Sequence, residues 1–162
     1  MSTYTIRPIQ KNDNEQIARV IRSVLIEHNV PKVGTAYADT ALDCMFEAYA
    51  TERAVYFVVE ENKTLIGGAG IAQLANYDGN VCELQKMYYM PQARGRGIGH
   101  EMISKCLEAA TSFGFEKCYL ETMTYMEAAQ KLYKKHGFEY LDGPMGDTGH
   151  CACPVQMLKE LS

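Results

Sequence analysis

Two kinds of segment are missing from this sequence of 162 residues. No apolar run approaches the roughly 20 residues that a membrane-spanning helix needs. The N-terminal MSTYTIRPIQ lacks the basic-then-apolar layout of a secretory signal peptide. We therefore expect no membrane partner and a cytoplasmic location. Interdomain linkers, internal repeats and low-complexity tracts are also absent, so we expect residues 1–162 to form a single domain.

An excess of positive charge is absent too, because the formal net charge is −4. This balance argues against general nucleic-acid binding, which depends on cationic contacts with phosphate, and it suits a cationic partner only weakly. The six cysteines, at positions 44, 82, 106, 118, 151 and 153, lie mostly in apolar segments and are expected to be buried thiols. Cys151 and Cys153 stand beside His150, but no fourth ligand with zinc spacing is present, so we expect no metal.

Hydrophobic periodicity predicts an alternation of strands and helices. Antiparallel hairpins come early and a helical crossover lies in the middle, which predicts a mixed α/β fold. Three glycines, at positions 67, 68 and 70, interrupt one strand and predict a bulge or a bend. Strands are expected at 4–9, 54–60, 64–74, 84–90, 117–122, 138–141 and 155–158, and helices at about 14–28, 39–49, 98–110 and 127–136.

The most informative stretch is LQKMYYMPQARGRGIG, residues 84–99. Pro91 ends a strand because proline cannot donate to a sheet ladder. The glycine-rich turn 95–99 then opens a helix, whose first backbone N–H groups have no partner inside the helix. Those donors and the positive end of the helix dipole form a site for phosphate, and Arg94 and Arg96 add cationic side chains beside it.

Several kinds of turn can be compared with this stretch. A Walker loop requires Lys-Ser or Lys-Thr, which this turn lacks. A dinucleotide-binding loop requires a third glycine where His100 stands, although Glu121 follows at a plausible distance. A tight strand-to-helix turn without a ligand is the plain structural alternative, but it gives no reason for two arginines that alternate with three glycines.

Residues 94–99 match every fixed position of Q/R-x-x-G-x-G/A, the acetyl-CoA loop of the GNAT superfamily of N-acetyltransferases. A second motif of that family, A-x-x-L-Y-x-x-x-G-F, is matched from Ala129 to Phe138 within LETMTYMEAAQKLYKKHGFEY. The sequence therefore resembles this family over nearly its whole length, with residues 28–55 matching only in general layout. One position departs from the pattern, since Met126 stands where members commonly carry an Asn.

The resemblance implies a GNAT-like fold, with a mixed and mostly antiparallel central sheet of six to seven strands flanked by about four helices. It also implies direct transfer of an acetyl group from acetyl-CoA to a primary amine of a small molecule or protein, in a ternary complex and without a metal. An acyl-cysteine route has no marked Cys–His pair to support it. The alternative function is a non-catalytic acyl-CoA binding or sensor module. A homodimer through an edge strand near the C-terminus is a further expectation.

The resemblance also assigns roles to residues. Tyr133 matches the general acid that protonates the leaving thiolate, a task that a nearby phenol can perform. Glu83 is expected to deprotonate the acceptor ammonium, with Glu121, His150 or water left open as alternatives. The implied cofactor-binding residues are Met87, Tyr88, Tyr89, Arg94, Gly95, Arg96, Gly97, Ile98, Gly99 and His100.

Among the implied cofactor-binding residues, Met87 and Tyr89 have a specific role. The pantetheine arm of acetyl-CoA is expected to pair with the strand there, in the manner of an added strand. An acceptor pocket is expected between residues 28–50, the turn 76–80 and the loop 142–153. Aromatic residues that either line it or simply pack in the core are Tyr37, Phe46, Tyr49 and Tyr125.

Overall fold

The computed structural model describes residues 3–29, 32, 37, 39–124, 126–146 and 154–161. Its centre is a seven-stranded sheet with the strand order β1-β2-β3-β4-β5-β7-β6. The strands are β1 (Thr5–Pro8), β2 (Val55–Glu61), β3 (Thr64–Gln73), β4 (Val81–Tyr89), β5 (Lys117–Thr122), β6 (Glu139–Tyr140) and β7 (Val155–Glu160). Every neighbouring pair is antiparallel except β4 and β5, which are parallel. The predicted mixed α/β fold is confirmed.

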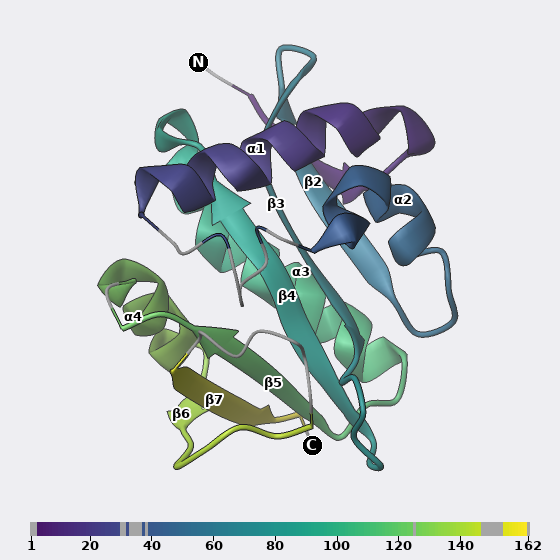
Figure 1. Ribbon diagram of the computed structural model, residues 1–162, viewed down its shortest axis with the longest axis vertical. Coiled ribbons are helices and arrows are strands. Elements are labelled where there is room, and N and C mark those ends of the chain that lie inside the picture. The colour runs from purple at the N-terminus through teal and green to yellow at the C-terminus, as the bar shows by residue number, and fades with distance from the viewer. Residues whose placement is uncertain are drawn as a thin grey trace.

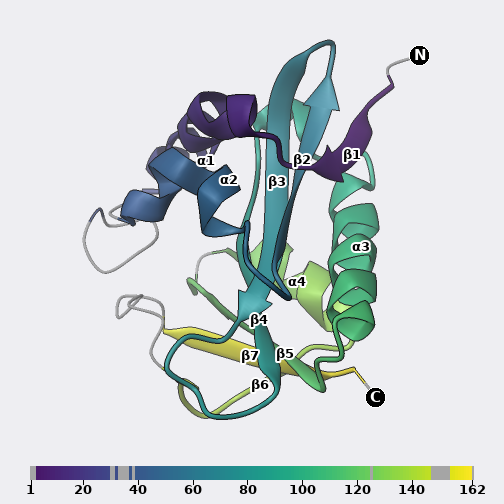
Figure 2. The same cartoon turned by 90° about the vertical axis from the view of Figure 1, so that its right-hand side faces the viewer.

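Helices cover both faces of this sheet (Figure 2). The helices are α1 (Asn14–Glu27), α2 (Met45–Ala48), α3 (Ile98–Ser112) and α4 (Glu127–Lys135), with short 3-10 turns at Lys11–Asp13, Thr40–Cys44 and Pro91–Ala93. Helices α1 and α2 lie on one face and α3 lies on the other (Figure 2). Helix α4 belongs to the α3 side of the core, because its Tyr133 packs in the same buried cluster as Met102 and Cys106 of α3. No helix in the described part of the chain is long and apolar enough to cross a membrane.

Strands β4 and β5 are paired over a short distance only. Their register joins Val81–Glu83 to Lys117–Tyr119, and no pair follows Glu83. Both strands continue beyond that point, and Figure 1 shows them running apart from a common origin. The second half of β4 therefore has a neighbour on its β3 side but no strand on its β5 side, within the described residues.

A bulge in β4 lies just beyond this fork. The register with β3 shifts between Gly68–Tyr88 and Gly70–Gln85. Lys86 sits in the bulge with a φ of 52°, and its carbonyl oxygen accepts a hydrogen bond of 2.8 Å from the Tyr56 hydroxyl. Bulges re-aim side chains and often lie next to active sites. The interrupted strand predicted from the glycines is thus seen as register shifts on both sides of β3.

The boundaries of two predicted elements differ from the structure. The helix expected over 39–49 is a 3-10 turn followed by the four residues of α2, because Cys44 adopts a φ of −141° and a ψ of 52°, outside the helical region. The strand expected over 138–141 contracts to β6, which pairs with β7 through two residues. Much of the expected loops 29–38 and 142–153 lies outside the described residues.

The glycines of β3 allow a testable prediction about this fold. A Cβ at Gly68 would stand 2.7 Å from the Tyr56 hydroxyl and 2.9 Å from the Phe57 carbonyl oxygen. We expect Gly68→Ala to lower the free energy of unfolding by about 2 kcal/mol, since an overpacked core must shift its neighbours. Urea denaturation measures this change. Gly143→Ala is the matched control, because nothing lies within 4 Å of a Cβ there; equal midpoints for both variants would contradict the tight seating of Tyr56.

Candidate functional site

A cleft of about 580 Å³ opens beside the unpaired half of β4. Four parts of the chain line it: the end of α1, the end of β4, the turn into α3, and α4. Every predicted cofactor-binding residue lines the cleft except Arg96, and Tyr133 lines it as well. The lining residues are Val24, His28, Met87, Tyr88, Tyr89, Ala93, Arg94, Gly95, Gly97, Ile98, Gly99, His100, Met126, Glu127, Ala128, Ala129, Leu132 and Tyr133.

The turn into α3 presents backbone donors to the cleft. Gly95 and Gly97 have φ values of 71° and 78°, a left-handed conformation that favours glycine. Within the described part of the chain, no hydrogen bond satisfies the N–H groups of Gly95 or of Gly97–His100. Helix α3 begins at Ile98, so its positive end faces the same space. This corner can hold an anion.

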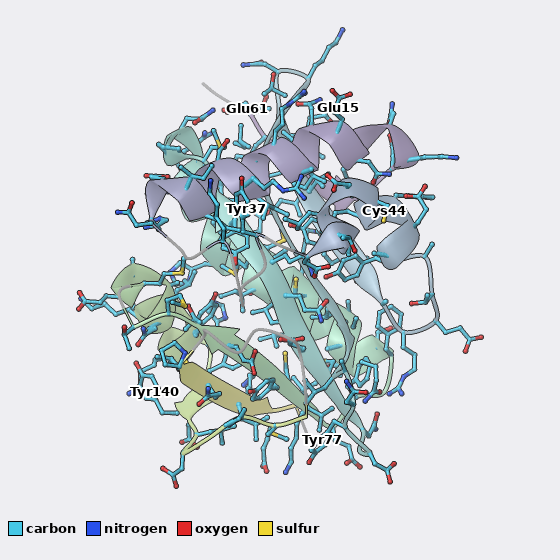
Figure 3. The ribbon with its side chains drawn as sticks, viewed as in Figure 1. Glu15, Tyr37, Cys44, Glu61, Tyr77 and Tyr140 are labelled. Carbon is cyan, nitrogen blue, oxygen red and sulfur yellow. The ribbon has the colours of Figure 1, made fainter. Side chains whose placement is uncertain are left out.

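The two arginines of the turn point to different partners. Arg94 lines the cleft, donates to the Tyr89 carbonyl oxygen, and forms a two-pronged ion pair of 2.7 and 2.8 Å with Glu27 of α1. Arg96 instead pairs with Glu61 at 2.6 Å, and its guanidinium stands 5.4 Å from the Tyr4 ring centroid. Glu61 lies at the β2–β3 hairpin, at the upper end of the molecule in Figure 3. Only Arg94 therefore brings its side chain to the cleft.

Tyr133 projects from α4 into the buried cluster under the cleft. Its ring packs edge-on against Phe138 with centroids 5.9 Å apart, and the side chain is 7% exposed. Burial raises the pKa of its hydroxyl well above the usual value near 10. The hydroxyl has no hydrogen-bond partner among the described residues. A phenol in this state can donate its proton to a group that enters the cleft.

Glu83 lies at the fork, as the last residue of β4 that pairs with β5. It is 3% exposed, and burial raises the pKa of its carboxyl to about 7. A hydrogen bond of 2.7 Å from the Gln85 amide opposes that rise, while the nearby Glu121 adds to it. A carboxyl with a pKa near neutrality is suited to proton transfer. Glu83 does not line the cleft described above, so the structure places it beside the cleft at the point where the two strands part.

The other candidate residues that the structure describes have structural partners or pack in the core. Glu121 accepts a hydrogen bond of 2.7 Å from the Tyr119 hydroxyl. Tyr49 is buried, and its hydroxyl donates to the Gln85 side chain. Phe46 and Tyr37 pack against the cluster under α1. Tyr125, His150, Cys151 and Cys153 lie outside the described residues.

Two histidines join α3 to α4 at the edge of the cleft. Nδ1 of His100 lies 3.1 Å from Nε2 of His136, and the ring centroids are 5.2 Å apart. Burial, together with the nearby His100 and Lys159, lowers the pKa of His136. The pair joins the first turn of α3 to the end of α4. Among the described residues, no group of three or more His, Cys, Asp or Glu could hold a metal ion.

Sequence reasoning did not identify two walls of the cleft. Val24 lies in α1 and His28 directly follows that helix, far from either family motif in the sequence. The first residues of α4, Met126–Ala129, also line the cleft and turn a second helix N-terminus toward it. Met126 occupies the N-cap position of α4 without a side-chain cap. Leu132, adjacent to Tyr133, was part of the second motif and contacts the turn at Gly99.

Comparisons with known proteins agree with this geometry. The model of the Acetyltransferase (GNAT) family matches residues 22–138. The uncharacterized N-acetyltransferase YjgM of Escherichia coli (strain K12) is 41% identical over 157 residues, which are 96% of this chain and 94% of that protein. The thialysine N-epsilon-acetyltransferase of Mus musculus is 28% identical over 148 residues, 87% of each chain.

Solved structures share the fold at lower sequence identity. An acetyltransferase of the GNAT family from Staphylococcus aureus Mu50 has a TM-score of 0.87 and 19% identity, over 99% of this chain and all of that one. The PaiA N-acetyltransferase of Thermoplasma acidophilum, solved in complex with coenzyme A, has a TM-score of 0.75 and 17% identity, over 98% of this chain and 99% of that one. The family model and the 41% identical relative show that this chain belongs to the GNAT family of N-acetyltransferases.

Proposed function

We propose that this chain binds acetyl-CoA in the cleft beside β4 and transfers the acetyl group to a primary amine by direct attack in a ternary complex. The observation that carries the proposal is the fork after Glu83. It leaves one edge of β4 open along a cleft that has unpaired amides at one end and Tyr133 on its wall. A long, amide-bearing thioester with a diphosphate at its far end fits these features.

The donors of the cleft support this placement of the cofactor. The amides of Gly95 and Gly97–His100, together with Arg94, would hold the diphosphate. The edge of β4 at Met87–Tyr89 would pair with the amides of the pantetheine arm. Related folds have been solved with the cofactor: the PaiA protein with coenzyme A, and the putative acetyltransferase yncA of Salmonella typhimurium with acetyl-CoA, the latter at a TM-score of 0.75 and 20% identity.

The two candidate catalytic groups divide the proton transfers. The acceptor arrives mainly as an ammonium ion, and Glu83, directly or through water, would take a proton from it to give the free amine. The amine nitrogen then attacks the thioester carbonyl, where backbone donors of β4 would stabilise the developing oxyanion. When the C–S bond breaks, Tyr133 would protonate the thiolate of coenzyme A, the nitrogen would lose its extra proton to water to give the neutral amide, and water would reprotonate Tyr133. No step in this sequence requires a metal.

The acceptor is proposed to be an amine of a small molecule or a protein. We also propose that residues 1–162 act as one catalytic domain, since a single sheet contains strands from Thr5 to Glu160. A cytoplasmic location is proposed because the described cysteines are free thiols, which a reducing compartment preserves. A homodimer through the sheet edge at β6 stays a prediction.

The direct experiment is an acceptor screen that follows release of free thiol from acetyl-CoA. We expect at least one class of amine to be acetylated, and acetyl-CoA but not NAD to raise the melting temperature. In Tyr133→Phe, kcat should fall by about 100-fold or more while the affinity for coenzyme A stays the same, because only the proton donor is lost. Tyr140→Phe is the control, since Tyr140 is exposed on the outer strand β6 (Figure 3). Cofactor binding without turnover on any amine would favour the acyl-CoA binding module instead.

The different directions of the two arginines predict different effects on cofactor affinity. Arg94→Gln should raise the dissociation constant for coenzyme A about tenfold, because a charge-assisted contact with phosphate is lost. The present pair with Glu27 should not prevent that contact, since its members are 37% and 40% exposed and such pairs are weak. Arg96→Gln should change the constant less than about threefold. Isothermal titration measures both, and equal losses would show that Arg96 also reaches the cofactor.

The raised pKa of Glu83 predicts the pH dependence. We expect kcat/KM to rise as pH increases through about 7, as Glu83 loses its proton, and we expect Glu83→Gln to lose this rise and about 100-fold in rate. If kcat/KM of Glu83→Gln rises with pH as it does in the wild type, the base is Glu121 or water.

The raised pKa of Glu83 also predicts how the stability of the folded protein changes with pH. The folded protein keeps the Glu83 proton to about pH 7, whereas the usual carboxyl value is 4.5. This residue therefore adds stability below pH 4.5 and loses it as pH rises through 7. Glu83→Gln should accordingly melt at a higher temperature than the wild type above about pH 8.

A further inference from the structure

Three polar side chains form a hydrogen-bonded chain at the fork of the sheet. The Tyr49 hydroxyl donates to Oε1 of Gln85, and Nε2 of Gln85 donates to Oε1 of Glu83 over 2.7 Å. Glu83 and Gln85 stand two residues apart on β4, so their side chains share one face of the sheet. Tyr49 directly follows α2. A residue from a distant part of the sequence therefore helps to hold the candidate base.

The hydrogen-bonding groups of this chain fit together in one orientation. The Tyr49 hydroxyl has no other partner among the described residues, so its proton must meet the carbonyl oxygen of the Gln85 amide. This contact turns the NH2 group of Gln85 toward the Glu83 carboxylate, which can only accept. An amide turned the other way would place its oxygen against the carboxylate and leave the Tyr49 proton without an acceptor. Tyr49 consequently sets the orientation of Gln85.

Close packing fixes the Tyr49 ring. The side chain is 7% exposed, and its ring centroid lies 5.2 Å from that of Tyr56. Gly70 of β3 stands opposite Gln85 in the register of the sheet. A Cβ at Gly70 would lie 3.1 Å from Cε1 of Tyr49 and 2.6 Å from Cδ1 of Tyr56. The missing side chain at this position therefore leaves room for both rings beside Gln85.

Only one oxygen of the Glu83 carboxyl is engaged in this chain. Oε1 accepts from Gln85, whereas Oε2 makes no hydrogen bond within the described part of the protein. Oε2 is nevertheless not fully enclosed, because the Tyr89 hydroxyl is the one fully buried side-chain nitrogen or oxygen without a partner among the described residues. Although Glu83 is only 3% exposed, its Oε2 is thus the atom that a water molecule or an amine can reach.

The surroundings of Glu83 make the Gln85 contact important for its ionisation. Burial and the nearby Glu121 favour the protonated carboxyl. Lys86 favours the carboxylate, but its ammonium pairs with Asp39 at 3.2 Å. Ala72, opposite Glu83 on β3, brings no charge. The titratable groups that face Glu83 or its hydrogen-bonded chain are Asp39, Tyr49, Lys86, Cys118, Tyr119 and Glu121.

We propose that Gln85 is a positioning residue for Glu83, and that Tyr49 fixes the Gln85 amide so that Oε2 of the carboxylate is presented to the acceptor ammonium. The proposal rests on the proposed function, because it needs Glu83 to act as the base. In the step, Oε2 takes a proton from the ammonium, directly or through one water. The N–H bond breaks, and the nitrogen keeps the electron pair with which it attacks the thioester. Glu83 then passes the proton to solvent, while Gln85 and Tyr49 keep their own protons.

The first test is a carbon-13 NMR titration of the Glu83 carboxyl, which needs no substrate and is assigned with Glu83→Gln. In Gln85→Met, we expect the pKa of Glu83 to rise above its value of about 7 by about 1 to 2 pH units, because the carboxylate loses its hydrogen bond. Tyr49→Phe should raise this pKa less, since the released amide can turn and accept the proton of the neutral carboxyl. In a Gln85→Met background, Tyr49→Phe should cause no further change.

The second test is the pH profile of kcat/KM, measured on an amine found in the acceptor screen. We expect kcat/KM of Gln85→Met to fall about 5- to 50-fold at pH 7 and to recover as pH rises through about 8 to 9, because the base then ionises. A purely structural defect would instead lower kcat/KM by the same factor at every pH.

Matched controls separate this role from packing. Gln73→Met removes an amide that donates to the Gly79 carbonyl oxygen, away from Glu83. Tyr56→Phe removes a buried hydroxyl beside Tyr49 whose partner is the Lys86 carbonyl oxygen. Both variants should keep the wild-type pKa of Glu83 and the wild-type pH profile, although Tyr56→Phe should melt at a lower temperature.

The possible failures of the proposal can be told apart. An unchanged pKa of Glu83 in Gln85→Met would overturn it and leave the proposed acetyl transfer intact, and an equal rise in Tyr56→Phe would assign the effect to packing. A raised pKa with an unmoved pH profile would show that Glu83 is not the base, which also overturns the role of Gln85. A wild-type protein that acetylates no amine would end the proposed function, and the NMR titration would still show whether Gln85 holds the carboxyl.

Discussion

The separation of β4 from β5 determines where this sheet can bind a ligand. Two parallel strands that stay paired to their ends would use their backbone groups on each other. Here the pairing stops at Glu83 ↔ Tyr119, although β4 continues to Tyr89 and β5 continues to Thr122. The open edge lies beside a cleft rather than at the rim of the sheet, so its polar groups can be used by a ligand. The fork also places the buried carboxyl of Glu83 at the base of the opening.

Glycines allow the surrounding elements to approach this fork closely. Gly95 and Gly97 adopt left-handed conformations that turn amides toward the cleft, and Gly99 lets α3 touch Leu132 of α4. In β3, glycines seat the rings of Tyr56 and Tyr89. The Tyr56 hydroxyl donates a hydrogen bond to the Lys86 carbonyl oxygen in the bulge of β4. The backbone next to the cleft is therefore held by close packing, which keeps the donors in place before a cofactor arrives.

The family, the order of elements and the residues of the turn could be predicted because they are local in the sequence. Two motifs with fixed spacing identify a GNAT protein, and the confirmed family supports that interpretation. The predicted strand 117–122 coincides with β5, and the helix predicted from Ile98 begins there. Each of these features depends on propensity, glycine placement or a contiguous motif, which a single sequence contains.

Contacts between distant segments could not be predicted in the same way. Arg96 follows the same pattern as Arg94, yet it pairs with Glu61, which a hairpin in another part of the sheet brings alongside. Val24 and His28 line the cleft because α1 crosses the sheet above the end of β4, as Figure 1 shows. The unsatisfied hydroxyl of Tyr89 depends on the packing of β3, α3 and α4 together. These features follow from tertiary structure, and no periodicity in the sequence encodes them.

The most direct measurement is a crystal structure of the protein with coenzyme A bound. The expected density shows the diphosphate within hydrogen-bond distance of the amides of Gly95 and Gly97–His100, the pantetheine arm along Met87–Tyr89, and the sulfur beside the Tyr133 hydroxyl. Coenzyme A bound elsewhere, or an extended β5 that closes the edge of β4, would contradict the fork as the site of catalysis.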